Sequence, residues 1–132
     1  MTYLFDTNVC VDLLKGHPMV SARVEAVSPA DCAISTVTAF ELAAGIRRCS
    51  RPEHERKKLN RLFSVIAVLP LDIKAAEHAA RIRHELESVG RKIGPYDLLI
   101  AGQAVSANRI LVSNNTKEFG RVTGLQLEDW RA

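Results

Sequence analysis

Three acidic residues lie far apart in the sequence, yet each lies where the chain could return it to one edge of a sheet. Asp6 directly follows the apolar run of residues 3–5, Glu41 follows a second apolar run, and Asp97 lies just after Pro95 at a predicted helix start. Three carboxylates in one crevice would repel one another, and a divalent cation with oxygen ligands relieves that repulsion. The pattern therefore predicts a magnesium or manganese site of the kind that holds phosphate groups.

Each acid also has a purely structural interpretation. Asp6 could cap the helix that follows it, which typically stabilises a helix by about 0.5 to 2 kcal/mol. Glu41 stands three residues after Thr38, the spacing of a capping box, although Ser35 and Val37 make an earlier helix start equally plausible. Asp97 could gain from the dipole of its helix. Taken singly, these structural roles are favoured, whereas the joint arrival of three acids at one sheet edge favours a functional site. Zinc is disfavoured, because neither histidine nor cysteine accompanies the acids.

The elements that must position these acids follow from the hydrophobic pattern. Short apolar runs predict strands at residues 2–5, 32–35, 66–71, 109–113 and 125–130. Amphipathic or helix-forming segments predict helices at residues 9–16, 20–27, 36–48, 54–66, 73–90 and 96–108. This alternation is typical of an α/β fold with a mostly parallel central sheet of four to five strands and helices on both faces. In such sheets ligands bind outside the carboxyl ends of the strands, where Asp6, Ser35 and residues 113–115 fall.

Composition narrows the class of protein. A chain of 132 residues that is 47% hydrophobic and 25% charged is expected to form a single domain, residues 1–132. No apolar stretch approaches the ~20 residues that span a bilayer, and no secretory signal pattern opens the chain. We therefore expect a soluble, cytoplasmic protein without a membrane partner. The formal net charge of +3 permits a nucleic-acid partner without requiring one.

Four stretches carry a family resemblance: "FDTNVCVDLL", "ISTVTAFELAAGIRR", "IGPYDLLIAGQA" and "LVSNNTKEFGRVTGLQLEDW". They resemble the signature segments of PIN-domain nucleases, specifically the VapC-type toxins of type II toxin-antitoxin pairs. The resemblance runs from about Tyr3 to Trp130. It implies a PIN-like three-layer α/β/α sandwich, formed here as a single PIN domain over residues 1–132.

The resemblance also implies an activity, that of a magnesium-dependent endoribonuclease toxin in which Mn²⁺ can substitute. Asp6, Glu41 and Asp97 match the three acids of the family's catalytic site. Asp6 and Asp97 would hold the cation directly, and Glu41 would act through the water that the metal activates for attack on phosphorus. A second ion is expected only with substrate.

The fourth metal position is open, because many PIN domains carry an aspartate where this chain has Asn114 and Asn115. Asparagine can bind a cation through its carbonyl oxygen, and Glu118 could supply the missing charge. Four polar residues, Thr7, Asn8, Ser35 and Asn114, could bind ligands or phosphate, or could equally serve as supporting residues and helix caps.

Substrate recognition is predicted less sharply. A basic set, Arg47, Arg48, Arg51, Lys57 and Lys58, is a candidate RNA-binding surface, with a merely solvated helix face as the alternative. The few aromatic residues give no indication of a platform on which bases stack. A tRNA substrate is implied by resemblance only.

The resemblance further implies partners. A cognate VapB-type antitoxin is expected, with a tail that fills the acidic crevice and places an arginine or lysine against the acids. A homodimer and a toxin-antitoxin hetero-oligomer are expected as well. The alternative function is a catalytically weak PIN module that acts mainly by binding a partner protein and nucleic acid.

Overall fold

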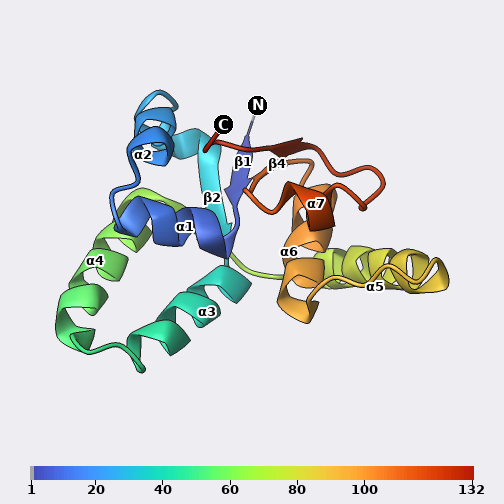
Figure 1. Ribbon diagram of the computed structural model, residues 1–132, viewed down its shortest axis with the longest axis horizontal. Helices are drawn as coiled ribbons and strands as arrows, with labels where there is room; N and C mark the ends of the chain where they lie inside the picture. Colours follow the sequence, from blue (N-terminus) through green and yellow to red (C-terminus); the bar gives the residue numbers. More distant parts are fainter. Residues whose placement is uncertain (1) are drawn as a thin grey trace.

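The structure is a computed structural model, and it describes residues 2–132 (Figure 1). Its elements, in chain order, are β1 (Tyr3–Phe5), α1 (Thr7–Leu14), α2 (Pro18–Glu25), the 3-10 helix η1 (Pro29–Asp31), β2 (Cys32–Ser35), α3 (Thr36–Ile46), α4 (Pro52–Val65), β3 (Ala67–Leu69), α5 (Ile73–Ser88), α6 (Pro95–Ser106), β4 (Ile110–Val112), α7 (Thr116–Phe119) and β5 (Leu127–Glu128). Within these residues, no helix combines the length and apolar composition needed to cross a membrane.

The predicted α/β class is confirmed, and each predicted strand and helix is present; the strand at residues 32–35 has the predicted bounds, and each of the others is shifted at one end or both. The sequence did not predict η1 or α7, which are too short to show a helical period. The last strand, predicted over six residues, is only Leu127–Glu128. Helix α1 begins two residues earlier than expected, because the Asp6 side chain accepts a hydrogen bond from the Val9 amide and caps it.

All five strands are parallel, in the order β3-β2-β1-β4-β5. The chain leaves β1, builds the sheet outward through β2 and β3, and then returns to place β4 on the other side of β1. The order of the strands therefore reverses between β1 and β4. In open parallel sheets, ligands bind at such a reversal, outside the carboxyl ends of the strands.

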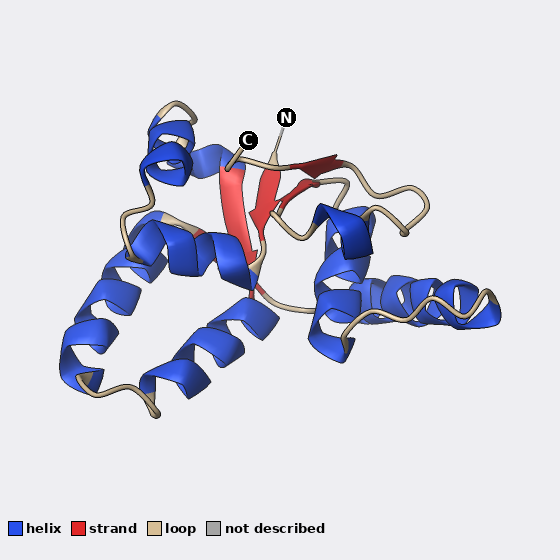
Figure 2. Cartoon of the chain, viewed as in Figure 1, coloured by secondary structure: helices blue, strands red, loops and turns tan. Residues whose placement is uncertain are grey.

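Helices cover both faces of the sheet, which gives the predicted three layers. Figure 2 shows the strands between one helical group, α1 to α4, and another that contains α5, α6 and α7. Alternate strand residues enter different cores: Leu4 packs against α5 and α6, whereas Phe5 packs against α1, α4 and the C-terminal Trp130. Both residues are fully buried, so the strands are held from two sides.

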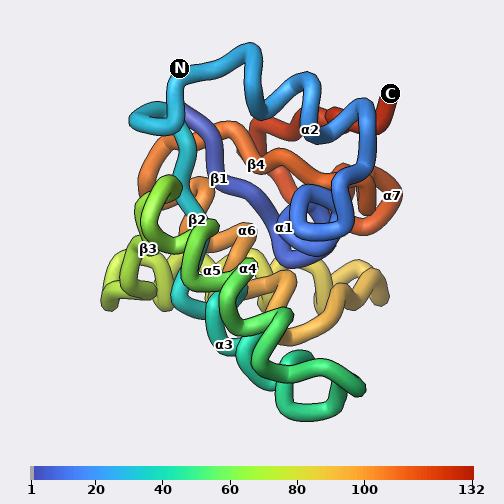
Figure 3. Tube along the Cα trace, turned by 90° about the vertical axis from the view of Figure 1, so that its left-hand side faces the viewer, coloured from blue at the N-terminus to red at the C-terminus, as the bar shows by residue number. Residues whose placement is uncertain are grey.

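Helix α3 contributes to both cores, because it passes below the carboxyl ends of the strands (Figures 1 and 3). Val37, near its start, packs with α5 and α6, and Leu42 packs with α1 and α4. The position of Glu41 on this helix is thereby tied to both layers.

Candidate active site

Three residues at the carboxyl ends of neighbouring strands line up at one edge of the sheet. Phe5 pairs with Ile34 of β2 and with Val112 of β4, so the next residues are Asp6, Ser35 and Ser113. The Ser113 hydroxyl donates a hydrogen bond of 2.5 Å to Asp6 Oδ2, across the reversal between β1 and β4. We call this region the carboxyl edge. The sequence pattern placed residues 113–115 at this edge, but Ser113 was not among the predicted site residues.

Asp6 is a buried acid without a positive partner. Its side chain is 2% exposed, Oδ1 accepts from the Val9 amide at 2.8 Å, and Oδ2 accepts from Ser113. The pKa of this carboxyl is raised to about 6, mainly by burial and to a smaller extent by the charges of Asp97 and Asp12, while the two hydrogen bonds partly offset the rise. Asp6 therefore does cap α1, as predicted. Capping alone, however, does not require the carboxylate to be buried or to lie near the carboxylates of Asp97 and Asp12.

The second and third predicted acids lie at the same edge. Glu41, in the second turn of α3, accepts a 2.6 Å hydrogen bond from the Thr7 hydroxyl. Asp97, in the first turn of α6, is half-buried, and its pKa is raised by burial and then by the charges of Glu41 and Glu118. The capping-box interpretation of Glu41 is wrong, because Ser35, not Thr38, caps α3 and accepts from the Val37 amide.

A fourth acid, Glu118 on α7, belongs to the same neighbourhood. Its charge acts on Asp97, and its Oε2 accepts a 3.1 Å hydrogen bond from the Asn115 side-chain amide. That bond leaves the Asn115 carbonyl oxygen free to face a ligand. We call Asp6, Glu41, Asp97 and Glu118 the acid cluster; they come from the end of β1 and from α3, α6 and α7.

No member of the acid cluster forms an ion pair with a lysine, arginine or histidine among residues 2–132. Within that range, no three His, Cys, Asp or Glu side chains stand close enough to hold a metal ion in the conformation described. Magnesium usually keeps several waters and takes only one or two carboxylates from a protein. The unpaired carboxylates around Asp97 offer only oxygen ligands. They therefore suit magnesium better than a cation that must take all of its ligands from the protein.

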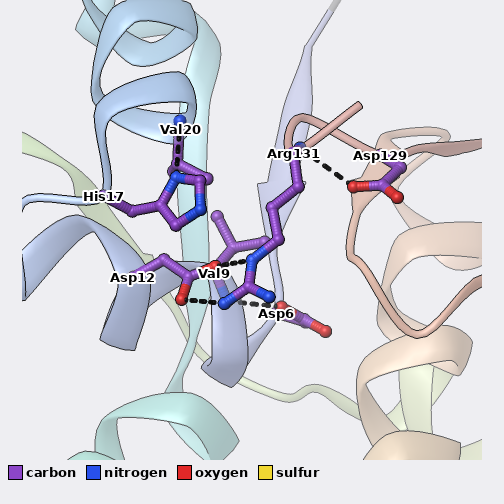
Figure 4. Close-up of polar contacts among 7 residues, drawn as sticks. All are labelled: Asp6, Val9, Asp12, His17, Val20, Asp129 and Arg131. Atoms are coloured by element: carbon purple, nitrogen blue, oxygen red, sulfur yellow. Dashed lines mark hydrogen bonds and ion pairs between the residues drawn. The ribbon is translucent and has the colours of Figure 1, made fainter.

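Asp12, a second buried acid near the start of the chain, is paired with a positive side chain. Asp12 is buried, and Figure 4 shows Arg131 reaching it from the C-terminal segment. The Arg131 guanidinium donates two hydrogen bonds to Asp12, of 2.6 and 2.7 Å, and holds the pKa of that carboxyl below its ordinary value. Asp12 is thus neutralised within the chain, whereas Asp6, six residues earlier, is not.

The predicted polar residues divide into three groups. Thr7 contacts the acid cluster by donating its hydroxyl proton to Glu41. The hydroxyl oxygens of Thr7 and Thr38 also lie 3.1 Å apart. Because Thr7 has only one hydroxyl proton, Thr38 is the donor in this second hydrogen bond. Ser35 is fully buried and serves as a helix cap. Asn8 is exposed on α1, and Asn114 is half-buried beside Ser113.

The predicted basic residues lie around the turn between α3 and α4, where Arg47, Arg48, Arg51 and Lys57 are exposed and Lys58 is half-buried. Lys58 is partly neutralised by Glu55, 3.5 Å away. A groove of about 480 Å³ runs between α1, α3 and α4 from Thr7 and Glu41 to Arg51 and Lys58. Its walls are mainly apolar, formed by Val11, Leu14, Leu42, Ile46 and Leu59. Of the basic set, Arg51 and Lys58 line this groove, whose opposite end is lined by Glu41 of the acid cluster.

Comparison with known proteins identifies the family. The PIN domain family model matches residues 3–125. The tRNA(fMet)-specific endonuclease VapC of Shigella flexneri is 39% identical over 130 residues, and ribonuclease VapC2 of Rickettsia felis is 36% identical over 132 residues; each alignment covers 98% of both chains.

Solved structures agree with the sequence comparison. The crystal structure of VapBC2 from Rickettsia felis bound to a promoter DNA fragment contains a chain that matches with a TM-score of 0.92 at 34% identity, over 98% of this chain and 99% of that one. The DNA-bound VapBC structure from Salmonella typhimurium gives a TM-score of 0.93 at 35% identity, over 98% of each chain. The chain described here therefore belongs to the PIN-domain family and, within it, to the VapC ribonucleases.

Proposed function

We propose that this protein is a magnesium-dependent endoribonuclease toxin and that the acid cluster is its catalytic and metal-binding site. The observation that carries the proposal is the arrival of four unpaired carboxylates, from four separate segments, at the reversal of a parallel sheet. The relatives named as ribonucleases support the activity. Manganese, which prefers the same oxygen ligands, should substitute for magnesium.

The residues of the acid cluster have different parts in this proposal. Asp6 is held at both oxygens by Val9 and Ser113, so its carboxylate cannot turn away from the crevice. Asp6 and Asp97 would bind the ion, with Asn115 and Glu118 completing the site through an amide oxygen or a bound water. When bound, magnesium supplies a Lewis acid beside the phosphate and lowers the pKa of water.

Glu41 has the geometry of a proton acceptor. Thr7 fixes its Oε1, and the Thr38 hydroxyl orients Thr7 in turn. The second oxygen, Oε2, is then free to accept a proton from the water that attacks phosphorus in line with the leaving 3′-oxygen. The protein itself needs no nucleophilic side chain, since the attacking atom comes from water.

The test is incubation of the purified, partner-free protein with total RNA in magnesium and in chelator. We expect discrete fragments with 5′-phosphate and 3′-hydroxyl ends, only when the metal is present. Cleavage that resists the chelator and leaves cyclic phosphates would assign the reaction to the ribose 2′-hydroxyl and overturn the proposal. Comparing tRNA with ribosomal RNA among the fragments tests the tRNA specificity that the Shigella flexneri relative's name describes.

We also propose a VapB-type antitoxin as partner, since two of the matching structures are VapBC complexes. An amphipathic antitoxin segment would fill the apolar groove and reach the acids at its end. Ile46→Lys places a charge on the groove wall, and we expect it to weaken binding of the co-expressed antitoxin without changing cleavage by the free protein. Val24→Lys, outside the groove, is the control.

Assembly and location follow from the same proposal. We expect a homodimer alone and a hetero-oligomer with the antitoxin, both measurable by sedimentation. Since the proposed RNA substrate and antitoxin are made in the cytoplasm, we place the protein there.

A further inference from the structure

Two aromatic side chains are exposed and belong to neither hydrophobic core. Of the seven aromatic residues in the chain, Phe40 and Tyr96 are the most exposed, at 55% and 45%. Their ring centroids lie 5.6 Å apart with the planes inclined at 62°, an edge-to-face pair. The pair joins residues 56 positions apart in sequence. Exposed apolar side chains that gather in one place commonly mark a binding surface.

Each ring of the aromatic pair belongs to the residue directly before an acid of the acid cluster. Phe40 directly precedes Glu41 on α3, and Tyr96 directly precedes Asp97 on α6. The first turns of α3 and α6 come together below the carboxyl ends of the strands (Figure 1). The two rings therefore lie beside the place where the proposed function puts the phosphate that is cut.

We propose that Phe40 and Tyr96 hold an unpaired base of the RNA, by stacking, next to the phosphate that the acid cluster acts on. This inference rests on the proposed ribonuclease function and names the residues that select the substrate. An edge-to-face pair leaves a face of at least one ring open, and a flat base can stack on that face whatever its sequence. The base would have to be unpaired, because a base inside a duplex has no free face.

Charge favours RNA over a second copy of this chain on this surface. Arg47, the C-cap residue of α3, is exposed seven residues after Phe40, a spacing of about two helical turns, and can meet the backbone of the adjoining nucleotides. A second copy seated symmetrically over the rings would instead bring another acid cluster toward Glu41 and Asp97. Phosphates are attracted by Arg47 and by a bound cation, whereas a second set of carboxylates is not attracted by the first.

The experiment compares two probes in chelator, so that nothing is cut. One is a fluorescent twelve-nucleotide oligoriboadenylate, and the other is a ribose-phosphate oligomer of the same length without bases. Stacking predicts that the wild-type protein binds the first about tenfold more tightly. Phe40→Ala and Tyr96→Ala should remove most of that preference while leaving binding of the base-free oligomer unchanged. Tyr96→Phe, which keeps the ring, should retain the preference.

Val65→Ala, at an exposed apolar residue on α4, is the control and should keep the full preference. The inference is overturned if the wild-type protein binds both probes equally, or if the alanine variants keep the preference. It is also overturned if Phe40→Ala changes a dimer into a monomer in sedimentation without altering the preference, because a second copy then covers the rings. If the wild-type protein never cuts RNA but shows a base preference that the alanine variants lose, the proposed function fails and this inference stands. If the wild-type protein cuts RNA normally but shows no base preference, the proposed function stands and this inference fails.

Discussion

The substitution Asp6→Asn should stabilise the metal-free protein at neutral pH. Asparagine has nearly the same shape, caps helices as well as aspartate does, and can still accept from the Val9 amide. Its amide group would face Ser113, whose hydroxyl can accept as well as donate. The change thus removes a buried negative charge and keeps the contacts.

The magnitude follows from the pKa of Asp6, which is raised from 3.8 to about 6. At 1.36 kcal/mol per pKa unit, this shift means that ionised Asp6 destabilises the folded state by about 3 kcal/mol. In the folded protein the group holds its proton up to about pH 6, whereas in the unfolded chain it loses it near pH 4. Stability of the metal-free protein should therefore fall as the pH rises from about 4 to about 6, and then level off. Asp6→Asn should recover up to about 3 kcal/mol at pH 7.5 and little at pH 4.

The assay is urea unfolding in chelator at both pH values. Asp72→Asn is a matched control, because Asp72 caps α5 through the Ala75 amide at 2.9 Å in the same way but is exposed. We expect the control to change stability by less than about 0.5 kcal/mol at either pH. Loss of stability in Asp6→Asn at pH 7.5, or an equal gain at both pH values, would refute the reasoning.

Three further predictions concern the metal, the packing and the C-terminus. Magnesium should raise the melting temperature of the wild-type protein at pH 7.5 but not below about pH 6, where protons compete with the ion for Asp6. Magnesium should have little effect on the melting temperature of Asp97→Asn. Scanning calorimetry at the two pH values measures both effects. Gly102→Ala should cost about 2 kcal/mol or more in urea unfolding, because the added carbon would lie 2.6 to 2.7 Å from backbone atoms of α5, while Gly45→Ala, which meets open space, should gain about 0.5 to 1 kcal/mol. Arg131→Met should lower the melting temperature at pH 7, and the loss should shrink as the pH falls below about 4, because the depressed pKa of Asp12 makes this ion pair a source of stability only while the acid is ionised.

The sequence predicted those features that depend on local pattern. Alternating apolar runs and helical periods gave the α/β class, and the position of Asp6 just after a strand pointed to the carboxyl edge. The placement of Glu41 and Asp97 near one another followed from parallel strand topology, because such a sheet collects its strand ends at one edge.

Other features depend on contacts that no local pattern encodes. The bond between Ser113 and Asp6 joins residues 107 positions apart, and it requires the strand register that places β4 beside β1. The Asp12–Arg131 ion pair spans 119 positions. The pairing of Phe40 with Tyr96 depends on how α3 and α6 cross. The number of aromatic residues gave no indication of a stacking surface, because such a surface depends on position. Phe40 and Tyr96 are both exposed and lie together only in the folded chain.

The most direct test of the central claim is a titration of the metal-free protein with Mn²⁺ at pH 7.5, in which free ion is measured by electron paramagnetic resonance. If the acid cluster is one cation site, the wild-type protein should bind one ion in the absence of RNA. Asp97→Asn should lose that binding, while Asp72→Asn, which removes an equal charge from an exposed helix cap, should keep it. Equal binding by the wild-type protein and Asp97→Asn, or equal loss in both variants, would contradict the account.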